Sequence, residues 1–190
     1  MTCAILALQG AFAEHAQKLR SLGEDVIELR QARDLDRSFD RLVLPGGEST
    51  VQRKLLGELD MLEPLRARIR QGIPVMGTCA GLILLAQEIR PSGEAGAFAT
   101  LPIAVERNAY GRQLGSFHAQ APYDQGEPVP LSFIRAPAIV ELLDDEVEVL
   151  CQVEGVPVAV RYRNQLALAF HPELDRDDRI HRSFLEMPCL

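Results

Sequence analysis

Short apolar runs alternate with segments of helical spacing in the first half of the chain. Residues 3–8, 25–29 and 42–44 are apolar runs with the length of buried strands, whereas residues 11–22 and 59–71 have the apolar spacing of amphipathic helices. Strands and helices that alternate in this way are typical of a mostly parallel sheet covered by helices on both faces. The pattern therefore predicts an α/β fold.

The composition of the chain changes in its second half. Residues 91–137 are rich in glycine, proline and polar residues, with short β-like segments at 101–105 and 131–134. We interpret this region as an antiparallel insertion with long loops. Three further strands and a terminal amphipathic helix are predicted at residues 147–153, 156–162, 166–170 and 176–187. Because no repeat or linker interrupts the pattern, we expect a single domain over residues 1–190.

Composition and charge narrow the class of function. The 190 residues are 47% hydrophobic and carry a net charge of −7, with acidic and basic residues interspersed. This balance argues against nucleic-acid binding and against attachment to an anionic membrane surface. No apolar run is long enough to span a bilayer, and the N-terminal run is too short for a signal peptide. We expect a cytoplasmic protein.

The cysteines give a further constraint. The chain has four of them, Cys3, Cys79, Cys151 and Cys189, and no two form a C-x-x-C pair. Their wide spacing argues against a zinc site and against a disulfide scaffold. We expect reduced thiols and no metal.

One cysteine lies in a glycine-flanked turn. The segment Gly77-Thr78-Cys79-Ala80-Gly81 separates a short apolar run from one that suits a buried helix. This G-x-C-x-G pattern is typical of a nucleophile elbow, a strained strand-to-helix turn whose glycines leave room where Cβ atoms would collide. The helix N-terminus favours a thiolate at Cys79, and its N–H groups can hold an oxyanion. The alternative is that Cys79 is a small buried hydrophobic side chain.

A second glycine-containing loop is expected at the same edge of the sheet. Residues 45–50, Pro-Gly-Gly-Glu-Ser-Thr, follow the predicted strand at 42–44. The two glycines let the backbone approach a ligand closely, and Ser49 or Thr50 can cap the next helix. Ligands of open parallel sheets bind beyond the carboxyl ends of the strands. The loop should therefore border the same site as Cys79, although an ordinary glycine turn fits these residues too.

A thiol nucleophile needs a base, and imidazole is suited to the task because its pKa lies near neutrality. His171 follows the predicted strand at 166–170, at the edge where the elbow should open. Glu173 lies two residues later, and in an extended segment stiffened by Pro172 both side chains would point the same way. The predicted arrangement is a Cys79–His171–Glu173 triad.

The other histidines have weaker claims to a catalytic role. His15 and His181 lie in helical patterns, where we expect structural or solvated side chains. His118 lies in the loop-rich insertion, and its surroundings assign it no catalytic role.

Taken together, these residues resemble a known family. The elbow at residues 77–81 with His171-Pro172-Glu173 is similar to the class I, or triad, glutamine amidotransferases. Other segments resemble one branch, the glutaminase subunit of the two-component pyridoxal 5'-phosphate synthase. These are residues 8–12 (LQGAF), 44–50 (LPGGEST), 107–108 with 111–113 (RN and GRQ) and 133–137 (FIRAP). The likeness covers the whole chain but departs at Gly115 and His118, where the family usually has acidic residues.

The resemblance implies a fold and a reaction. The fold is a flavodoxin-like three-layer sandwich with the nucleophile elbow at Cys79. The reaction is hydrolysis of L-glutamine to L-glutamate and ammonia through a thioester on Cys79. His171 would carry the proton and Glu173 would hold His171. The oxyanion hole would consist of the backbone N–H groups of Gly47 and Ala80.

The resemblance also implies substrate contacts and a partner. By their charge, Arg107 or Arg135 is suited to meet the carboxylate of glutamine and Glu48 its ammonium group, and backbone groups are the alternative ligands. The ammonia would pass to a pyridoxal 5'-phosphate synthase subunit in a large hetero-oligomeric ring complex, and the glutaminase itself would bind no metal and no cofactor. The residues implied at the substrate are Gly47, Glu48, Ser49, Arg107, Ile134 and Arg135.

Three alternatives stay open at this point. The chain is another hydrolase or amidotransferase with the same elbow, a non-catalytic binding module, or a DJ-1-like redox or stress protein that also uses an elbow cysteine. The presence of Cys79, His171 and Glu173 together argues against a non-catalytic module. The His-Pro-Glu segment and the Gly46-Gly47 loop argue against the redox protein.

Overall fold

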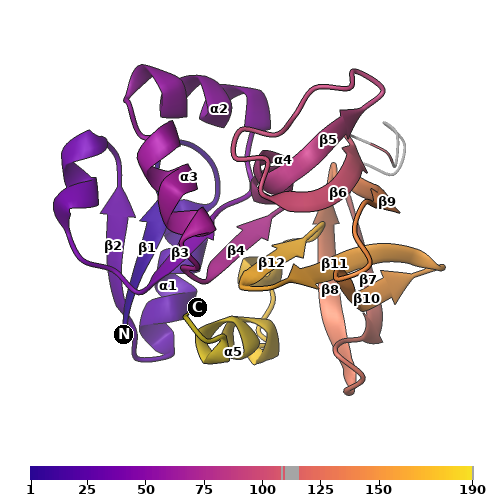
Figure 1. Ribbon diagram of the computed structural model, residues 1–190. Helices are drawn as coiled ribbons and strands as arrows, with labels where there is room; N and C mark the ends of the chain where they lie inside the picture. The colour runs from indigo at the N-terminus through magenta and orange to yellow at the C-terminus, as the bar shows by residue number, and fades with distance from the viewer. Residues whose placement is uncertain (108, 110–115, 190) are drawn as a thin grey trace.

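A seven-stranded sheet forms the centre of the molecule (Figure 1). The computed structural model of the chain describes residues 1–107, 109 and 116–189. The strands of the sheet are β1 (Thr2–Leu6), β2 (Asp25–Leu29), β3 (Arg41–Leu44), β4 (Val75–Thr78), β10 (Glu148–Val153), β11 (Val156–Tyr162) and β12 (Gln165–Leu168). Their order is β10-β11-β12-β4-β3-β1-β2. The strands from β12 to β2 pair in parallel, and β11 and β10 continue the sheet in antiparallel pairing.

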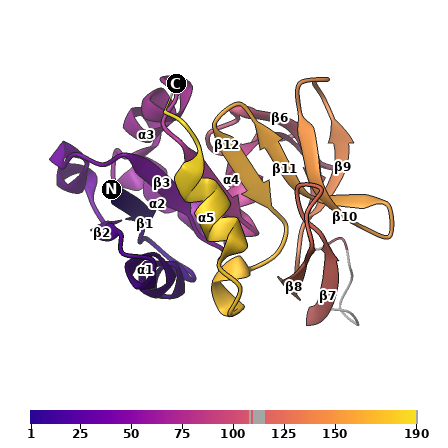
Figure 2. The same cartoon turned by 90° about the horizontal axis from the view of Figure 1, so that it is seen from below.

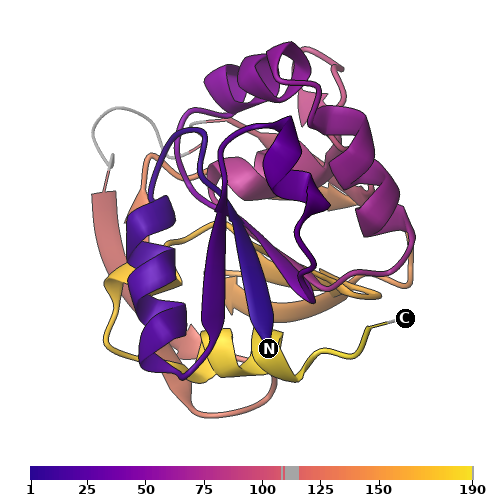
Figure 3. The same cartoon turned by 90° about the vertical axis from the view of Figure 1, so that its left-hand side faces the viewer.

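Helices cover both faces of this sheet, as the strand and helix alternation predicts. The helices are α1 (Phe12–Ser21), α2 (Ser49–Glu58), α3 (Leu62–Arg70), α4 (Ala80–Leu85) and α5 (Arg179–Glu186), with short 3-10 helices η1 (Ala32–Asp36) and η2 (Pro172–Leu174). Helices α1 and α5 lie on one face, and α2, α3 and α4 lie on the other (Figures 1, 2 and 3). Every residue of β3, β4 and β12 is buried, because a sheet covered on both faces has no solvated side.

The inserted region forms two small sheets beside the central one. Strands β5 (Ala86–Arg90), β6 (Leu101–Glu106) and β9 (Ala138–Leu142) form the first, and β7 (Ser116–Pro122) with β8 (Pro128–Ile134) forms the second. The β6–β9 and β7–β8 pairs are antiparallel, as expected for the insertion, but the β5–β6 pair is parallel. The family-like residues 108 and 111–113, and the departure at Gly115, lie outside the described residues.

The insertion also begins earlier than the sequence pattern predicts. We expected the insertion to start at residue 91, but the helix after the elbow ends at Leu85 and β5 begins at Ala86. All six residues of α4 are buried, so continuing the helix would carry polar Gln87 and Glu88 into an apolar environment. As a strand, the segment leaves Gln87 exposed and Ile89 buried.

The elbow depends on the close approach of helix α4 to strand β3. A Cβ atom at Gly81 would lie 2.0 Å from the carbonyl oxygen of Leu44, and one at Gly77 would lie 2.8 Å from the carbonyl carbon of Gly81. Cys79 stands between these glycines with a φ of 49°, in the left-handed region that L-residues rarely adopt. The expected steric role of both glycines is confirmed.

Two helix boundaries differ from the predicted ones. The helix expected at 59–71 begins at Leu62, because the chain first passes through Asp60 with a φ of 54°. The terminal helix expected at 176–187 begins at Arg179, after the side chain of Asp177 accepts a hydrogen bond from the Arg179 N–H. In the described part of the chain, no helix combines the length and apolarity needed to cross a membrane.

The close approach at Gly81 predicts a large effect of a single methyl group. We expect Gly81→Ala to lower the free energy of unfolding by about 2–3 kcal/mol, because the added Cβ would overlap the backbone of Leu44. Gly57→Ala is the matched control, since Gly57 lies exposed in α2 with nothing within 4 Å of the added atom. The free energy of unfolding of Gly57→Ala should rise by about 0.4–1 kcal/mol. Urea unfolding of the three proteins measures both changes, and equal stabilities would contradict the packing described here.

Candidate active site

The loops that follow four neighbouring parallel strands lie at one edge of the sheet. Strands β12, β4, β3 and β1 lie side by side, and the segments after them begin near His171, Cys79, Gly46 and Gln9. Together with residues of the insertion they enclose a cavity of about 330 Å³. It is lined by Gln9, Gly10, Ala11, Gly46, Gly47, Glu48, Ser49, Thr50, Cys79, Ile83, Arg107, Ile134, Arg135 and His171. The predicted site at the carboxyl ends of the strands is therefore a real cavity of the fold.

Cys79 sits at the floor of this cavity with little exposure. Only 7% of its surface is accessible, and its N–H donates to the carbonyl of Leu168 on the neighbouring strand at 2.8 Å. Its Sγ lies 3.9 Å from the carbonyl oxygen of Ile134, which belongs to the insertion. The side chain lines the cavity rather than the apolar core, so the alternative of a structural cysteine is disfavoured.

His171 and Glu173 form the predicted pair, but the backbone between them has a different conformation from the predicted one. The Nδ1 of His171 lies 2.7 Å from Oε1 of Glu173, and both residues are buried. We expected an extended segment, whereas Pro172–Leu174 is a turn of 3-10 helix. This expectation was wrong because Pro172 has the backbone angle of a first helical residue, and the turn curls the carboxylate back under the ring. The N–H of His171 is held by the carbonyl of Ser132 at 2.8 Å.

The electrostatics of the pair favour a charged imidazole. Burial alone would lower the pKa of His171, but the neighbouring Cys79 and Glu173 groups favour its charged form and raise that pKa to about 10. Burial alone would raise the pKa of Glu173, but its neighbours His15 and His171 hold it below its usual value. At neutral pH the pair therefore has an ionised carboxylate and a proton on His171 that can be given to a leaving group.

Polar side chains, of which Thr78 and Gln52 are buried and Gln9 is half-buried, hold the glycine loop in place, and the sequence pattern did not predict them. The Oγ1 of Thr78 accepts the N–H of Gly46 at 3.0 Å, and Oε1 of Gln9 accepts the N–H of Glu48 at 2.7 Å. Gln52 in α2 donates to the carbonyls of Gln9 and Pro45 at 2.9 and 3.1 Å. The signal that could have found Gln9 is its place in the loop after β1, the strand next to β3 in the parallel order.

The residues implied at the substrate come together around the cavity. Gly47, Glu48, Ser49, Arg107, Ile134 and Arg135 all line it, whereas Ala80 and Glu173 lie behind the lining residues. An exposed ion pair of 3.1 Å joins Arg135 to Glu48 across the cavity mouth. The Nε of Arg107 is buried without a hydrogen-bond partner among the described residues.

The remaining histidines lie outside the cavity. His15 and His181 are completely buried on helices α1 and α5, which confirms a structural rather than a solvated position. His118 contacts Oγ of Ser132 through Nδ1 at 3.0 Å, away from the lining residues. Among the described residues, no group of three or more histidine, cysteine or acidic side chains is arranged to hold a metal ion.

Comparison with known proteins identifies the family. The model of the SNO glutamine amidotransferase family matches residues 5–189. The chain belongs to the SNO glutamine amidotransferase family. The resemblance noted from the elbow and the His-Pro-Glu segment is thereby confirmed, and a DJ-1-like redox protein is not supported.

Individual relatives in this glutamine amidotransferase family are similar over nearly their full length. Two are named "Pyridoxal 5'-phosphate synthase subunit PdxT". The protein from Desulfitobacterium hafniense is 54% identical over 98% of this chain and 92% of its own length. That from Methanocorpusculum labreanum is 52% identical over 98% and 97%. A solved structure titled "Crystal structure of glutamine amidotransferase" is 41% identical, covers 97% of both chains and has a TM-score of 0.91.

More distant structures share the fold alone. A structure of PurLQS from Thermotoga maritima is 14% identical, with a TM-score of 0.72 over 97% of this chain and 96% of its own. The expected mostly parallel α/β architecture is thus confirmed by both the strand order and the structural likeness.

The buried histidines behind the site predict a pH dependence of stability. Burial lowers the pKa of His181 to about 3, and it lowers that of His15 as well. Below pH about 6.5 the unfolded chain binds protons at these rings that the folded chain does not, so stability falls as the pH falls. His181→Gln should reduce the slope of unfolding free energy between pH 6 and 5 by about 1.4 kcal/mol per pH unit. Urea titrations at several pH values measure this slope, and an identical slope in both proteins would show that His181 titrates normally.

Proposed function

We propose that the protein hydrolyses L-glutamine to L-glutamate and ammonia, as the glutaminase subunit of a pyridoxal 5'-phosphate synthase. The observation that carries this proposal is the convergence of Cys79, His171 and Glu173 at one end of a cavity bordered by the Gly46–Ser49 loop. Family membership and relatives named as synthase subunits support the choice of reaction.

The proposed reaction has two halves. The Sγ of Cys79 attacks the side-chain amide carbon of glutamine, and the carbonyl oxygen becomes an oxyanion held by the N–H groups of Gly47 and Ala80. The C–N bond then breaks, and ammonia leaves with a proton from His171. A water molecule that gives its proton to His171 attacks the thioester, and the C–S bond breaks to release glutamate and regenerate Cys79.

Glu173 acts through His171 rather than on the substrate. Its Oε1 accepts the Nδ1–H of the ring at 2.7 Å, which leaves Nε2 as the nitrogen for proton transfer. Nε2 has no hydrogen-bond partner among the described residues, as expected for an atom that serves an incoming substrate. The pKa of His171, raised to about 10, keeps a proton available for the departing ammonia at neutral pH.

The two charged ends of glutamine have candidate partners around the cavity. Glu48 is suited to the ammonium group, and Arg107 or Arg135 to the carboxylate. The ion pair between Glu48 and Arg135 supports this assignment, because both side chains line the same cavity. Each can leave the other and pair with the oppositely charged end of a ligand. Gly47, Ser49 and Ile134 complete the proposed contacts.

We propose that the released ammonia passes to a partner synthase subunit, within a large hetero-oligomeric ring complex in the cytoplasm. The relatives named as synthase subunits support a partner. The four cysteines are free in the structure, in keeping with a reducing compartment. Ile134 is 40% exposed beside the cavity, where docking of a partner would cover it.

The first test is ammonia release from glutamine, with and without the synthase subunit of the same organism. The wild-type chain should release ammonia, and the partner should raise the rate. In Cys79→Ala the rate of ammonia release should fall at least about a thousandfold, because no other side chain in the described part of the chain is placed to form the thioester. Cys151→Ala is the control, since Cys151 is buried on β10 outside the cavity. Release by the Cys79→Ala protein, or no release in any mixture, would overturn the assigned reaction.

The second test concerns the ammonium end of the substrate. Glu48→Gln removes the charge and should raise the KM for glutamine by about tenfold, with kcat changed by less than about threefold. Glu58→Gln is a matched control, because Glu58 is an exposed acid at the far end of α2 that pairs only loosely with Lys54, at 3.6 Å. Steady-state kinetics of both variants separate the two parameters. A KM unchanged by Glu48→Gln would remove Glu48 from the binding site.

A further inference from the structure

His15 is a completely buried histidine that the proposed reaction does not use. It lies on α1, outside the residues that line the cavity, with none of its surface exposed. A buried imidazole is costly unless its nitrogens have partners, so its contacts show what it does. These contacts lead directly to the triad.

The first contact is with the carboxylate of the triad. Oε1 of Glu173 is occupied by the Nδ1 of His171, at 2.7 Å. Oε2 is also buried, and it makes no hydrogen bond of good geometry among the described residues. The group set against it is Nε2 of His15, at 3.3 Å, in a pair whose side chains have no exposed surface. Glu173 thus lies between two imidazole rings, one facing the substrate and one facing the core.

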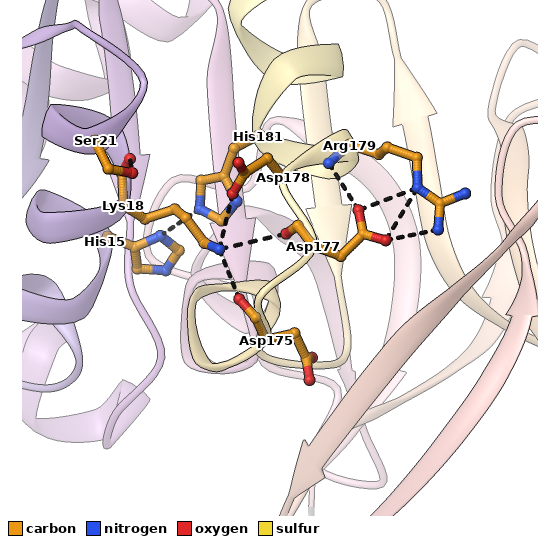
Figure 4. A network of polar contacts seen from close by, with 8 residues as sticks. All are labelled: His15, Lys18, Ser21, Asp175, Asp177, Asp178, Arg179 and His181. Carbon is orange, nitrogen blue, oxygen red and sulfur yellow. Dashed lines mark hydrogen bonds and ion pairs between the residues drawn. The ribbon is translucent and has the colours of Figure 1, made fainter.

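The second contact defines which nitrogen of His15 carries the proton. Burial lowers the pKa of His15, so the ring is neutral and has one N–H. A carboxylate oxygen beside Nε2 requires the proton to be there, and Nδ1 is then an acceptor. Nε2 of His181 lies 3.4 Å from that Nδ1, so His181 donates to His15 (Figure 4). The Nδ1 of His181 is buried without a hydrogen-bond partner among the described residues, which agrees with an unprotonated nitrogen.

The third contact joins the same ring edge to the glycine loop. Nε2 of His15 lies 3.2 Å from Oγ1 of Thr78, the residue before the nucleophile. That hydroxyl oxygen also accepts the N–H of Gly46 at 3.0 Å. One imidazole edge therefore contacts both the acid of the triad and the anchor of the loop.

Helix α1 is held against the triad segment independently of His15. Lys18, one turn further along, donates to the carbonyl of Asp175 at 2.6 Å and to Oδ1 of Asp178 at 2.9 Å (Figure 4). These bonds join the helix to the residues that follow Glu173. A change at His15 consequently leaves a second attachment in place, and a change at Lys18 leaves the His15 contacts in place.

We propose that His15 is a positioning residue of the triad, which directs its Nε2–H at Oε2 of Glu173 and keeps that carboxylate ionised and aligned under His171. The inference rests on the proposed role of Cys79, His171 and Glu173. Without this N–H, the imidazole donor 3.3 Å from the buried Oε2 is lost, and Glu173 gains a proton more readily. The titratable groups around this carboxylate are His171 on one side, the neutral His15 and His181 on the other, and Lys18 and Asp178 at the edge of the cluster.

The test uses the reactivity of Cys79 itself, so that it does not depend on glutamine turnover. The rate of carboxamidomethylation of Cys79 by iodoacetamide is measured from pH 5.5 to 9 by mass spectrometry of its peptide. In His15→Phe the rate at pH 6.5 should fall at least about fivefold, because the imidazolium that attracts the thiolate is less stable. At pH 9 it should stay within about twofold of the wild-type rate. His15→Gln, which keeps an N–H near the position of Nε2, should restore most of the rate at pH 6.5.

Two controls separate positioning from a merely structural effect. Lys18→Met loosens the same helix, and its profile should keep the wild-type midpoint. Cys189, which is exposed near the C-terminus, is an internal control for the reactivity of iodoacetamide in every sample. An unchanged midpoint in His15→Phe, an equal loss at every pH, or no rescue by His15→Gln would overturn the proposal. If the profiles shift as expected but the wild-type chain with its partner releases no ammonia, the reaction is wrong and the positioning role stands.

A measurement on the wild-type protein covers the case in which His15→Phe does not fold. Nitrogen-15 NMR of the histidine rings distinguishes the two neutral tautomers of each buried imidazole. We expect His15 to carry its proton on Nε2 and to remain neutral at pH 7. A proton on Nδ1 instead would overturn the proposal.

Discussion

A buried carboxylate needs a partner for each of its oxygens, and this requirement shapes the centre of the molecule. Glu173 is almost fully buried and ionised, and its two oxygens face His171 and His15. One partner follows a sheet strand and the other comes from helix α1, so the acid lies between the sheet edge and the helix layer. The position of α1 on this face is therefore part of the site, although none of its residues from Phe12 onward lines the cavity. An acid without either neighbour would protonate or move toward solvent.

The parallel sheet divides the site into a substrate side and a supporting side. The loops after β1, β3, β4 and β12 meet at one edge, and residues of these loops line the cavity. On this side the charged groups, Glu48 and Arg135, are more than half exposed and can rearrange when a ligand enters. On the supporting side the polar groups are buried and hydrogen-bonded within the protein: Thr78 bonds His15 and the N–H of Gly46, and Gln52 donates to the carbonyl of Gln9. The proposed reacting groups are thus held by the buried side, while the proposed substrate contacts belong to the exposed side.

Much of this arrangement can be predicted from the sequence, because its strongest signals are local. Apolar runs identify the parallel strands, and two glycines around Cys79 identify a turn whose crowding the structure confirms. The His171–Glu173 pair was also predictable, although its 3-10 turn was not, since the same spacing fits an extended segment. The contact of His15 with Glu173 leaves no local trace, because a helical histidine on an apolar face looks the same whether it meets a leucine or a carboxylate. The parallel pairing of β5 and β6 could not be predicted for the same reason, because the relative direction of two strands depends on the path of the segment that connects them.

The choice of an imidazole behind Glu173 has an electrostatic consequence. An arginine or lysine at this position would satisfy the same oxygen, but its permanent charge would offset the negative charge that stabilises His171 in its protonated form. A buried neutral histidine supplies an N–H without a net charge, because burial keeps its pKa low. His181 preserves this state by donating to the other ring nitrogen, at 3.4 Å. The inner oxygen of the carboxylate therefore faces a neutral imidazole at 3.3 Å, and the carboxylate keeps its negative charge toward His171. The proposed role of His171, which holds a proton until ammonia departs, depends on both properties.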